Sequence, residues 1–183
     1  MSIPIGEVQQ VRTEAELLFS ESEIEAALAR MAGAIAAELA DKNPLMLTIM
    51  VGGMLFAGEL AKRMPIPMQL DYLHVTRYRG ATSGGEVAWL GKEPPPLAGR
   101  HLLIVDDILD EGHTLKAIVD FCYAQRAASV ATAVLLDKHG ARKAAIAADH
   151  VGFACPSRYV FGFGMDYKGY WRNLPAIYAV RGK

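Results

Sequence analysis

The stretch LLIVDDILDEGHT, residues 102–114, constrains the fold of this chain more than any other. Its first four residues form a continuous apolar run, which favours a central parallel strand covered on both faces. The adjacent acids Asp106 and Asp107 stand where we expect that strand to end. Beyond Gly112, apolar residues recur at helical spacing to about Arg126. The stretch therefore predicts a strand, an acidic loop and the start of a helix.

The same stretch has the residues of a site for a phosphorylated sugar. Ligands of open α/β sheets bind at the carboxyl ends of strands, and a helix N-terminus with bare N–H groups attracts anions. Carboxylates would repel a phosphate at that position. The conflict disappears if the acids hold sugar hydroxyls or a divalent cation, while backbone amides hold the phosphate. Those amides would belong to Glu111, Gly112, His113 and Thr114.

A second strand, glycine turn and helix precede this stretch. Ser20 and Glu23 match a capping box, and a helix with apolar residues at regular spacing should follow to Asp41. Residues 45–51 then predict a buried strand, which ends at Gly52-Gly53 before a helix over residues 54–63. Glycines there could admit an anion or could simply form a structural turn, and this turn alone favours neither.

The remaining segments have weaker signals. We expect strands over residues 67–78, 87–90 and 130–136, an apolar run over 159–163, and an edge strand over 176–180. The Gly/Ser/Thr-rich segment 79–86 is either an exposed hairpin tip, which composition favours, or a lid over a site. Lys138, at a strand end, and the aromatic and charged segment 166–172 have ordinary explanations, a solvated lysine and a core corner.

Composition excludes several classes of protein. With 183 residues, 52% hydrophobic and 21% charged, the chain predicts one ordered domain. A formal net charge of −1 gives no case for binding nucleic acid or membranes. No apolar run reaches the ~18 residues of a membrane helix and no signal peptide is evident, so we expect a cytoplasmic protein. Cys122 and Cys155 form no CxxC pair and predict buried free thiols. The five histidines have no metal-binding spacing.

The 102–114 stretch resembles the phosphoribosyl-pyrophosphate signature of the type I phosphoribosyltransferases, and the order of the other segments resembles the hypoxanthine-guanine branch. The resemblance covers residues 45–180 and includes the glycine turn, Tyr78, Lys138, the Tyr159-Val160 pair and the segment DYKGYWR. It implies an α/β fold with a mostly parallel twisted sheet flanked by helices. It further implies a single domain over 1–183, a small hood made from the N- and C-terminal segments, and a flexible lid at about 76–88.

The resemblance also implies a task for each site residue. In the phosphoribosyl pyrophosphate site, Asp106 and Asp107 would hold the ribose, directly or through Mg²⁺, and residues 111–114 would hold the 5′-phosphate. Pyrophosphate would bind Arg172 and the turn of Val51, Gly52 and Gly53, with Tyr78 in the lid. Asp110 would transfer the proton at N7 of the purine. Lys138 would contact the 6-oxo group, Tyr159 would stack on the ring, Val160 would read the base edge and Asp166 would bind Mg²⁺.

These assignments predict an Mg²⁺-dependent purine salvage enzyme. It would convert hypoxanthine or guanine and phosphoribosyl pyrophosphate to IMP or GMP and pyrophosphate, as a homodimer or homotetramer. Two positions depart from the family pattern, since Val51 replaces a common lysine and Arg77 precedes Tyr78 where serine is usual. One alternative is a regulator of the same fold that senses phosphoribosyl pyrophosphate without catalysis. Another is a phosphotransfer receiver domain, which would not explain Gly112, Thr114 or DYKGYWR.

Overall fold

The structure, a computed structural model, describes residues 3–77, 87–90 and 93–182. The helices are α1 (Ile5–Glu14), α2 (Glu21–Leu39), α3 (Gly53–Lys62) and α4 (His113–Ala124). The strands are β1 (Glu16–Phe19), β2 (Leu45–Met50), β3 (Gln69–Arg77), β4 (Val87–Trp89), β5 (His101–Leu109), β6 (Ser129–Lys138), β7 (His150–Cys155), β8 (Val160–Phe161) and β9 (Ile177–Ala179).

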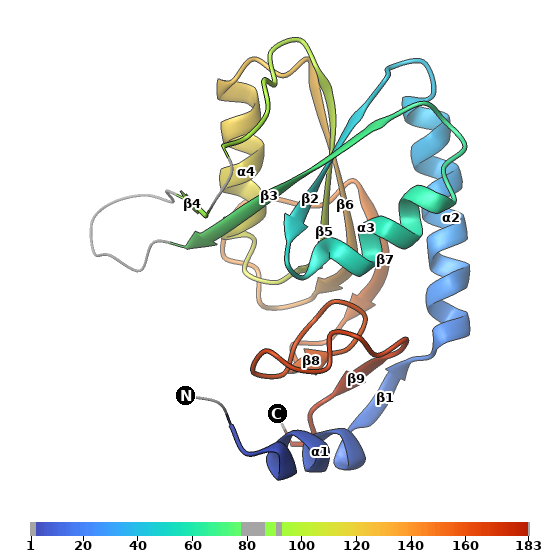
Figure 1. Cartoon of the computed structure of the whole chain (residues 1–183), viewed down its shortest axis with the longest axis vertical. Coiled ribbons are helices and arrows are strands. Elements are labelled where there is room, and N and C mark those ends of the chain that lie inside the picture. Colours follow the sequence, from blue (N-terminus) through green and yellow to red (C-terminus); the bar gives the residue numbers. More distant parts are fainter. Residues whose placement is uncertain (1–2, 78–86, 91–92, 183) are drawn as a thin grey trace.

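A twisted sheet with the strand order β4-β3-β2-β5-β6-β7 forms the larger part of the described molecule (Figure 1). Strands β3, β2, β5, β6 and β7 run parallel to one another, and β4 pairs antiparallel with β3 at the edge of the sheet. Helix α4 lies on one face, and α2 and α3 lie on the other. The predicted α/β fold is therefore confirmed, with β5 at the centre of the parallel strands.

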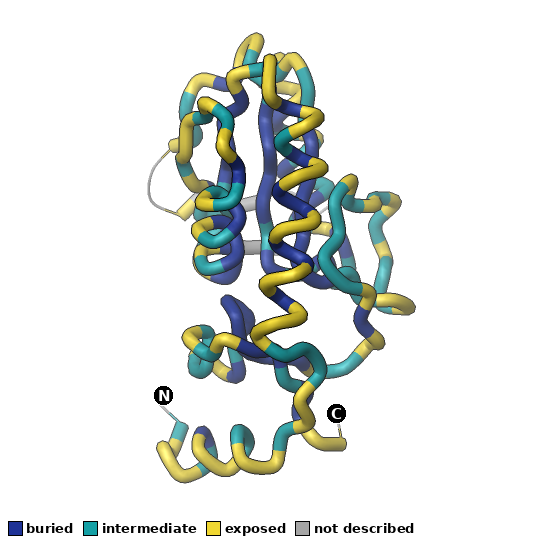
Figure 2. Tube along the Cα trace, turned by 90° about the vertical axis from the view of Figure 1, so that its right-hand side faces the viewer, coloured by how far each residue is buried: buried dark blue, intermediate teal, exposed yellow. Residues whose placement is uncertain are grey.

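Both faces of β5 are buried, as its apolar run predicts. Leu103 and Val105 pack into the core beneath α2 and α3, while Leu102 and Ile104 pack into the core beneath α4. All four side chains have no exposed surface, and each contributes roughly 1.5–3 kcal/mol by leaving water. Figure 2 shows the buried strands at the centre and the exposed faces of the helices outside. The central strand is thus held rigidly up to the acids that follow.

A second, smaller sheet lies beyond the carboxyl ends of the parallel strands. It has the order β1-β9-β8 and is antiparallel, and α1 lies beside it (Figure 1). We call α1, β1, β8 and β9 the hood. The indole Nε1 of Trp171 donates to the carbonyl of Val8 at 2.7 Å, which ties α1 to the C-terminal segment. The prediction of an edge strand at 176–180 is wrong, because β9 lies between β1 and β8.

The start of α2 confirms the predicted capping box. The Ser20 hydroxyl accepts from the Glu23 amide at 3.4 Å, and the Glu23 carboxylate accepts from the Ser20 amide at 2.8 Å. Cys122 and Cys155 are buried free thiols, also as predicted. In the part of the chain that the structure describes, no helix is long and apolar enough to cross a membrane. Residues 78–86 of the predicted lid, with Tyr78, lie outside the described residues.

Candidate active site

The parallel strands bring the predicted site residues to one edge of the large sheet. β2 pairs with β5, and β5 pairs with β6 up to Leu109 opposite Asp137. Because parallel strands end at the same edge, the glycine turn after β2, the acids of β5 and Lys138 of β6 lie close together. The sequence predicted a strand that ends before Asp106, which is wrong. Pairing with β6 continues β5 through both acids, so they lie in the strand and the loop begins at Asp110.

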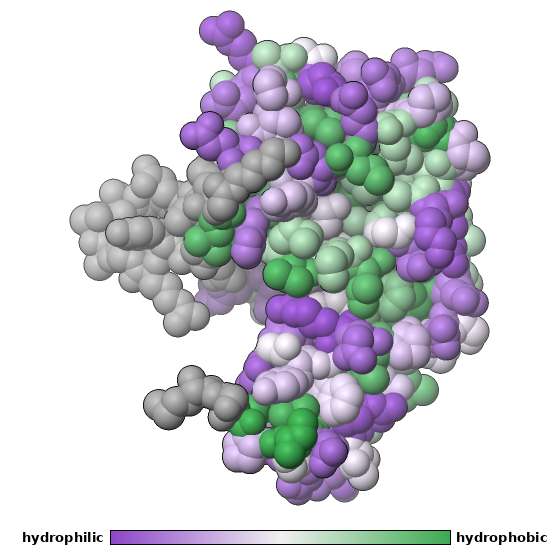
Figure 3. Space-filling view, in the orientation of Figure 1, coloured by the Kyte–Doolittle hydropathy of each residue, from purple (hydrophilic) through white to green (hydrophobic). Residues whose placement is uncertain are grey.

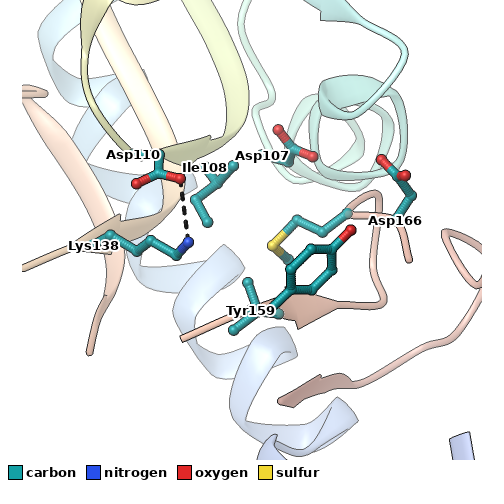
Figure 4. Close-up of a pocket in the computed structure, with 8 residues that line it drawn as sticks. Asp107, Ile108, Asp110, Lys138, Tyr159 and Asp166 are labelled. Carbon is teal, nitrogen blue, oxygen red and sulfur yellow. Dashed lines mark hydrogen bonds and ion pairs between the residues drawn. The ribbon is translucent and has the colours of Figure 1, made fainter. Parts of the chain in front are cut away.

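A pocket of about 230 Å³ lies between this edge and the hood (Figure 4). It is lined by Asp107, Ile108, Asp110, Lys138, Tyr159, Val160, Met165 and Asp166. Six of these eight were predicted as site residues from the sequence. Ile108 and Met165 were missed, although Ile108 stands between predicted acids and could have been inferred from that position. Asp110 and Lys138 lie on one side of the pocket and Asp166 on the other, with Tyr159 between them.

Asp110 and Lys138 form an ion pair within the pocket. The Lys138 ammonium lies 3.2 Å from the Asp110 carboxylate, and the side chains are 13% and 43% exposed, respectively. The register of β5 and β6 creates this contact, because each residue immediately follows one of the paired residues Leu109 and Asp137. Lys138 is therefore a partly buried charge with a defined partner and not a solvated surface lysine.

The adjacent carboxylates of Asp106 and Asp107 each have a raised pKa. Burial, with the negative charge of Asp107, raises the pKa of Asp106 well above its ordinary value. Burial also raises the pKa of Asp107, although hydrogen bonds and the positive charge of Arg172 act in the opposite direction. Neighbouring acids that are costly to ionise are suited to a cation or to the hydroxyls of a sugar.

The turn after β2 contacts these acids directly. A Cβ at Gly52 would lie 2.1 Å from Oδ2 of Asp107, and one at Gly53 would lie 2.9 Å from the carbonyl of Val105. Gly164 has a φ of +102°, and a Cβ there would lie 2.2 Å from the carbonyl of Gly52. Glycine is thus required for packing at this turn. Of the two explanations that the sequence left open, a structural turn and an anion site, the first therefore holds. Val51 is 43% exposed, and the peptide bond before it is cis.

The C-terminal segment is both a core corner and part of the site. Arg172 forms an ion pair with Asp166 and donates to the carbonyl of Gly164. The second oxygen of Asp166 accepts from the Gly169 amide at 2.7 Å. In contrast, Tyr167 is buried in the hood. The segment therefore presents Asp166 to the pocket at the sheet edge, whereas Tyr167 packs in the hood and Lys168 pairs with Glu7 of α1.

The loop before α4 ends at a glycine N-cap, and the helix begins where the sequence predicts. Gly112 has a φ of +86° and caps α4, which begins at His113. The first amides of a helix, here including those of His113 and Thr114, have no partner within the helix. The carbonyl of Glu111 accepts from the amides of Lys143 and Ala144 at 2.9 and 3.0 Å. We call residues 111–114 the phosphate turn.

The segment that supports this turn was missed from the sequence. A Cβ at Gly112 would lie 2.9 Å from Ile146 and 3.0 Å from Arg142. These residues follow β6 in a stretch without periodic apolar residues, so no sequence pattern indicated the contact. The phosphate turn, the glycine turn, Asp106 and Arg172 surround the pocket without being among its lining residues.

Comparison with known proteins shows the family of the chain. Residues 16–168 match the model of the phosphoribosyl transferase domain. The chain belongs to the phosphoribosyltransferase family. It is 37% identical over 163 residues to the hypoxanthine-guanine phosphoribosyltransferase of Streptococcus pneumoniae strain R6, with 88% of this chain and 91% of that protein covered. The resemblance identified in the sequence is thus confirmed.

Other phosphoribosyltransferases agree in sequence and in fold. The bifunctional protein TilS/HprT of Listeria innocua is 37% identical over 88% of this chain, which spans 25% of that longer protein. The crystal structure of a hypoxanthine phosphoribosyltransferase from Staphylococcus aureus has a TM-score of 0.87 and 30% sequence identity, covering 93% of this chain and 94% of the other. The fold and the assignment to an enzyme family are therefore both confirmed.

Proposed function

We propose that the protein is an Mg²⁺-dependent 6-oxopurine phosphoribosyltransferase of purine salvage. It would convert hypoxanthine or guanine and phosphoribosyl pyrophosphate to IMP or GMP and pyrophosphate. The observation that carries this proposal is the pocket in which the Asp110–Lys138 pair faces Asp107 and Asp166 across Tyr159. One side offers groups for a purine, and the other offers carboxylates for a sugar and a cation.

The donor would bind along the acids and the two glycine-containing turns. Asp106 and Asp107 would hold the ribose, and the amides of the phosphate turn would hold the 5′-phosphate. Arg172, whose charge opposes the burial-driven rise in the pKa of Asp107, would hold pyrophosphate together with the turn from Val51 to Gly53. Tyr78 belongs to this set only through the family resemblance.

The acceptor would bind on the other side of the pocket. Lys138 would donate to the 6-oxo group, Tyr159 would stack on the purine ring, and the backbone of Val160 would contact the base edge. Tyr159 is 41% exposed and lines the pocket, so a ring could lie against it. Asp110 would accept the proton from N7 as the base becomes bonded to the sugar.

The chemistry explains why these groups surround the pocket. The bond between C1 of the ribose and pyrophosphate breaks, and its electron pair leaves with pyrophosphate. Positive charge develops on the sugar until N9 of the purine bonds to C1. Arg172 would stabilise the departing oxygens, and a closed lid would exclude water that could otherwise capture the sugar.

The donor set of the site fits magnesium. Mg²⁺ prefers oxygen ligands and is usually bound by one or two carboxylates together with substrate phosphates. Asp106, Asp107 and Asp166 supply carboxylates, and the raised pKa of the first two is the shift that a bound cation would counter. Bound there with the substrate, Mg²⁺ would neutralise charge on the leaving pyrophosphate. Among the described residues, no three His, Cys, Asp or Glu side chains lie together as a metal site, so substrate oxygens would have to complete the ligand set.

The wider context of the protein is also part of the proposal. We expect one cytoplasmic phosphoribosyltransferase domain that binds neither nucleic acid nor membranes and forms a homodimer or homotetramer. Leu70 and Tyr72 of β3 and Met54 of α3 are exposed apolar side chains, and apolar surface gathers over these elements in Figure 3. Such surface favours self-association. The relatives named above give no support to a regulator without catalysis.

The test is product formation with different bases. Protein supplied with Mg²⁺ and phosphoribosyl pyrophosphate should form IMP from hypoxanthine and GMP from guanine, each with one equivalent of pyrophosphate. Adenine is the matched control, because its 6-amino group cannot accept from Lys138. Equal rates with adenine would contradict the assignment of Lys138. Competition among hypoxanthine, guanine and xanthine would then rank the bases.

A further inference from the structure

Arg142 connects the ends of the central strands. It follows β6 by four residues, and its guanidinium forms an ion pair with Asp137 near the end of that strand. The same Nη2 atom lies 3.5 Å from the carbonyl of Leu109, the last residue of β5. Since Leu109 and Asp137 face each other in the sheet register, one guanidinium spans both strand ends.

The Arg142 side chain also lies against the phosphate turn. A Cβ at Gly112 would come within 3.0 Å of its Cδ, so glycine is needed for the turn to pack on the arginine stem. The next two residues after Arg142 donate their amides to the carbonyl of Glu111. The conformation of the phosphate turn therefore depends on where this arginine and its neighbours lie.

The Nη1 atom of Arg142 is buried and has no hydrogen-bond partner among the described residues. An unsatisfied donor costs free energy, and an apolar side chain of similar length would fill the same space without that cost. The charge therefore has little value for packing alone. The contacts of its charged group are with Asp137 and Leu109, at the ends of the two strands beside the turn.

We propose that Arg142 is a positioning residue for the 5′-phosphate. By joining the ends of β5 and β6 beneath Gly112, it holds the amides of the phosphate turn in their binding orientation. It does not touch the purine pocket, whose lining excludes it. This inference rests on the proposed function, because it assumes that the turn binds the 5′-phosphate of the substrate and product.

The test compares ligands that differ only in the phosphate. Binding of IMP and of inosine is measured by calorimetry for the wild type, Arg142→Met and Arg142→Lys. Arg142→Met should weaken IMP binding by about tenfold and leave inosine binding unchanged, because only IMP carries the phosphate. Arg142→Lys can still pair with Asp137, so it should recover part of the lost IMP affinity. If the methionine variant does not fold, the lysine variant provides the test.

The control is Arg30→Met. Arg30 of α2 also donates to backbone carbonyls, those of Val151 and Gly152 at 3.2 and 2.7 Å. Because α2 lies on the face of the sheet opposite α4, the Arg30 variant should bind both ligands normally. Equal weakening of IMP and inosine in Arg142→Met, or none, would overturn the positioning role. A wild type that binds IMP but forms none from hypoxanthine would instead contradict the proposed function.

Discussion

At the scale of single residues, the ion pair between Asp110 and Lys138 is the centre of the proposed chemistry. The pair joins two strand ends, and both partners line the same pocket. In the proposed reaction, the carboxylate takes a proton while the ammonium donates to the neighbouring oxo group. In this proposal the two charges would act on N7 and the 6-oxo group, which share one edge of the purine, and the two side chains lie side by side to match.

Replacing Asp110 should separate catalysis from binding. Asp110→Asn keeps the size of the side chain but cannot accept the proton, so turnover should fall by roughly 10²–10⁴-fold. The affinity for phosphoribosyl pyrophosphate should change little. Steady-state kinetics measures both values. Asp120→Asn is the matched control, since Asp120 is exposed on α4 and pairs with Lys116. Unchanged turnover in Asp110→Asn would remove this residue from the mechanism.

Any side chain at Gly52 should weaken the binding of phosphoribosyl pyrophosphate. In Gly52→Ala the new Cβ would overlap the Asp107 carboxylate, so the KM for phosphoribosyl pyrophosphate should rise by about tenfold or more. Gly58→Ala on α3 is the control, because a Cβ there meets no atom within 4 Å. It should be neutral or stabilise the helix by about 0.5–1 kcal/mol. Equal KM values in both variants would contradict the packing argument.

The two thiols should be unreactive in the folded protein. Burial raises the pKa of Cys122 to about 12 and also raises the pKa of Cys155. Both groups therefore stay protonated at about pH 8, and the thiolate is the reactive form. Mass spectrometry after iodoacetamide treatment should find neither modified until denaturant is added. Because folding raises these pKa values, the stability that they confer is present below about pH 9 and is lost as the pH rises above it. Rapid alkylation of the native protein would contradict their burial.

At the scale of elements, two strand–turn–helix units lie side by side in the large sheet. β2 leads to the glycine turn and α3, and β5 leads to the phosphate turn and α4. Their parallel pairing sets both turns at one sheet edge, where the hood closes the pocket from the other side. In the proposed site, the helix N-termini would bind the anionic groups of the substrate, and the strand ends supply the charged side chains.

The cap of α2 should contribute to stability without affecting the site. Ser20→Ala removes the hydroxyl that accepts from the Glu23 amide, which should lower the free energy of unfolding by about 1 kcal/mol. Urea denaturation measures this change. The KM values for both substrates should remain those of the wild type, since α2 starts outside the pocket lining. A changed KM with unchanged stability would show that the cap has another role.

Sequence patterns predicted the elements with a strong local signal. The buried runs of β2, β5 and β6 and the capping box of α2 were all found, and the signature of residues 102–114 located the acids. The end of β5 was misplaced because charged residues usually end a strand, whereas pairing with β6 continues it here. β1 and β7 were missed since they have few buried residues, which leaves no clear pattern.

Site residues, like the secondary-structure elements, could be predicted only where the sequence has a local signal. Residues within a recognisable motif, such as Asp110, Lys138 and Tyr159, were named and lie together in the pocket. The residues that pack behind the site were not predicted. Contacts such as that of Arg142 with Gly112 join two segments that no local sequence pattern connects. The need for glycine at position 52 likewise depends on a carboxylate from another strand.

At the scale of the whole molecule, the pocket lies between the large sheet and a hood made from both ends of the described chain. Tyr159 and Asp166 come from the C-terminal segment, while Asp107, Asp110 and Lys138 come from the sheet. The large sheet and the C-terminal segment therefore each supply part of the pocket lining, and the complete pocket requires the two to pack together. Within the hood, the bond from Trp171 to the carbonyl of Val8 ties α1 to the C-terminal segment that carries Asp166.

The most direct test of this account is pyrophosphate release that depends on the base. Purified protein with Mg²⁺ and phosphoribosyl pyrophosphate should release pyrophosphate when hypoxanthine or guanine is added, and should release far less without a base. Asp110→Asn, measured beside it, should lose most of that rate. If neither hypoxanthine, guanine nor xanthine caused any release by the wild-type protein, the account would be wrong.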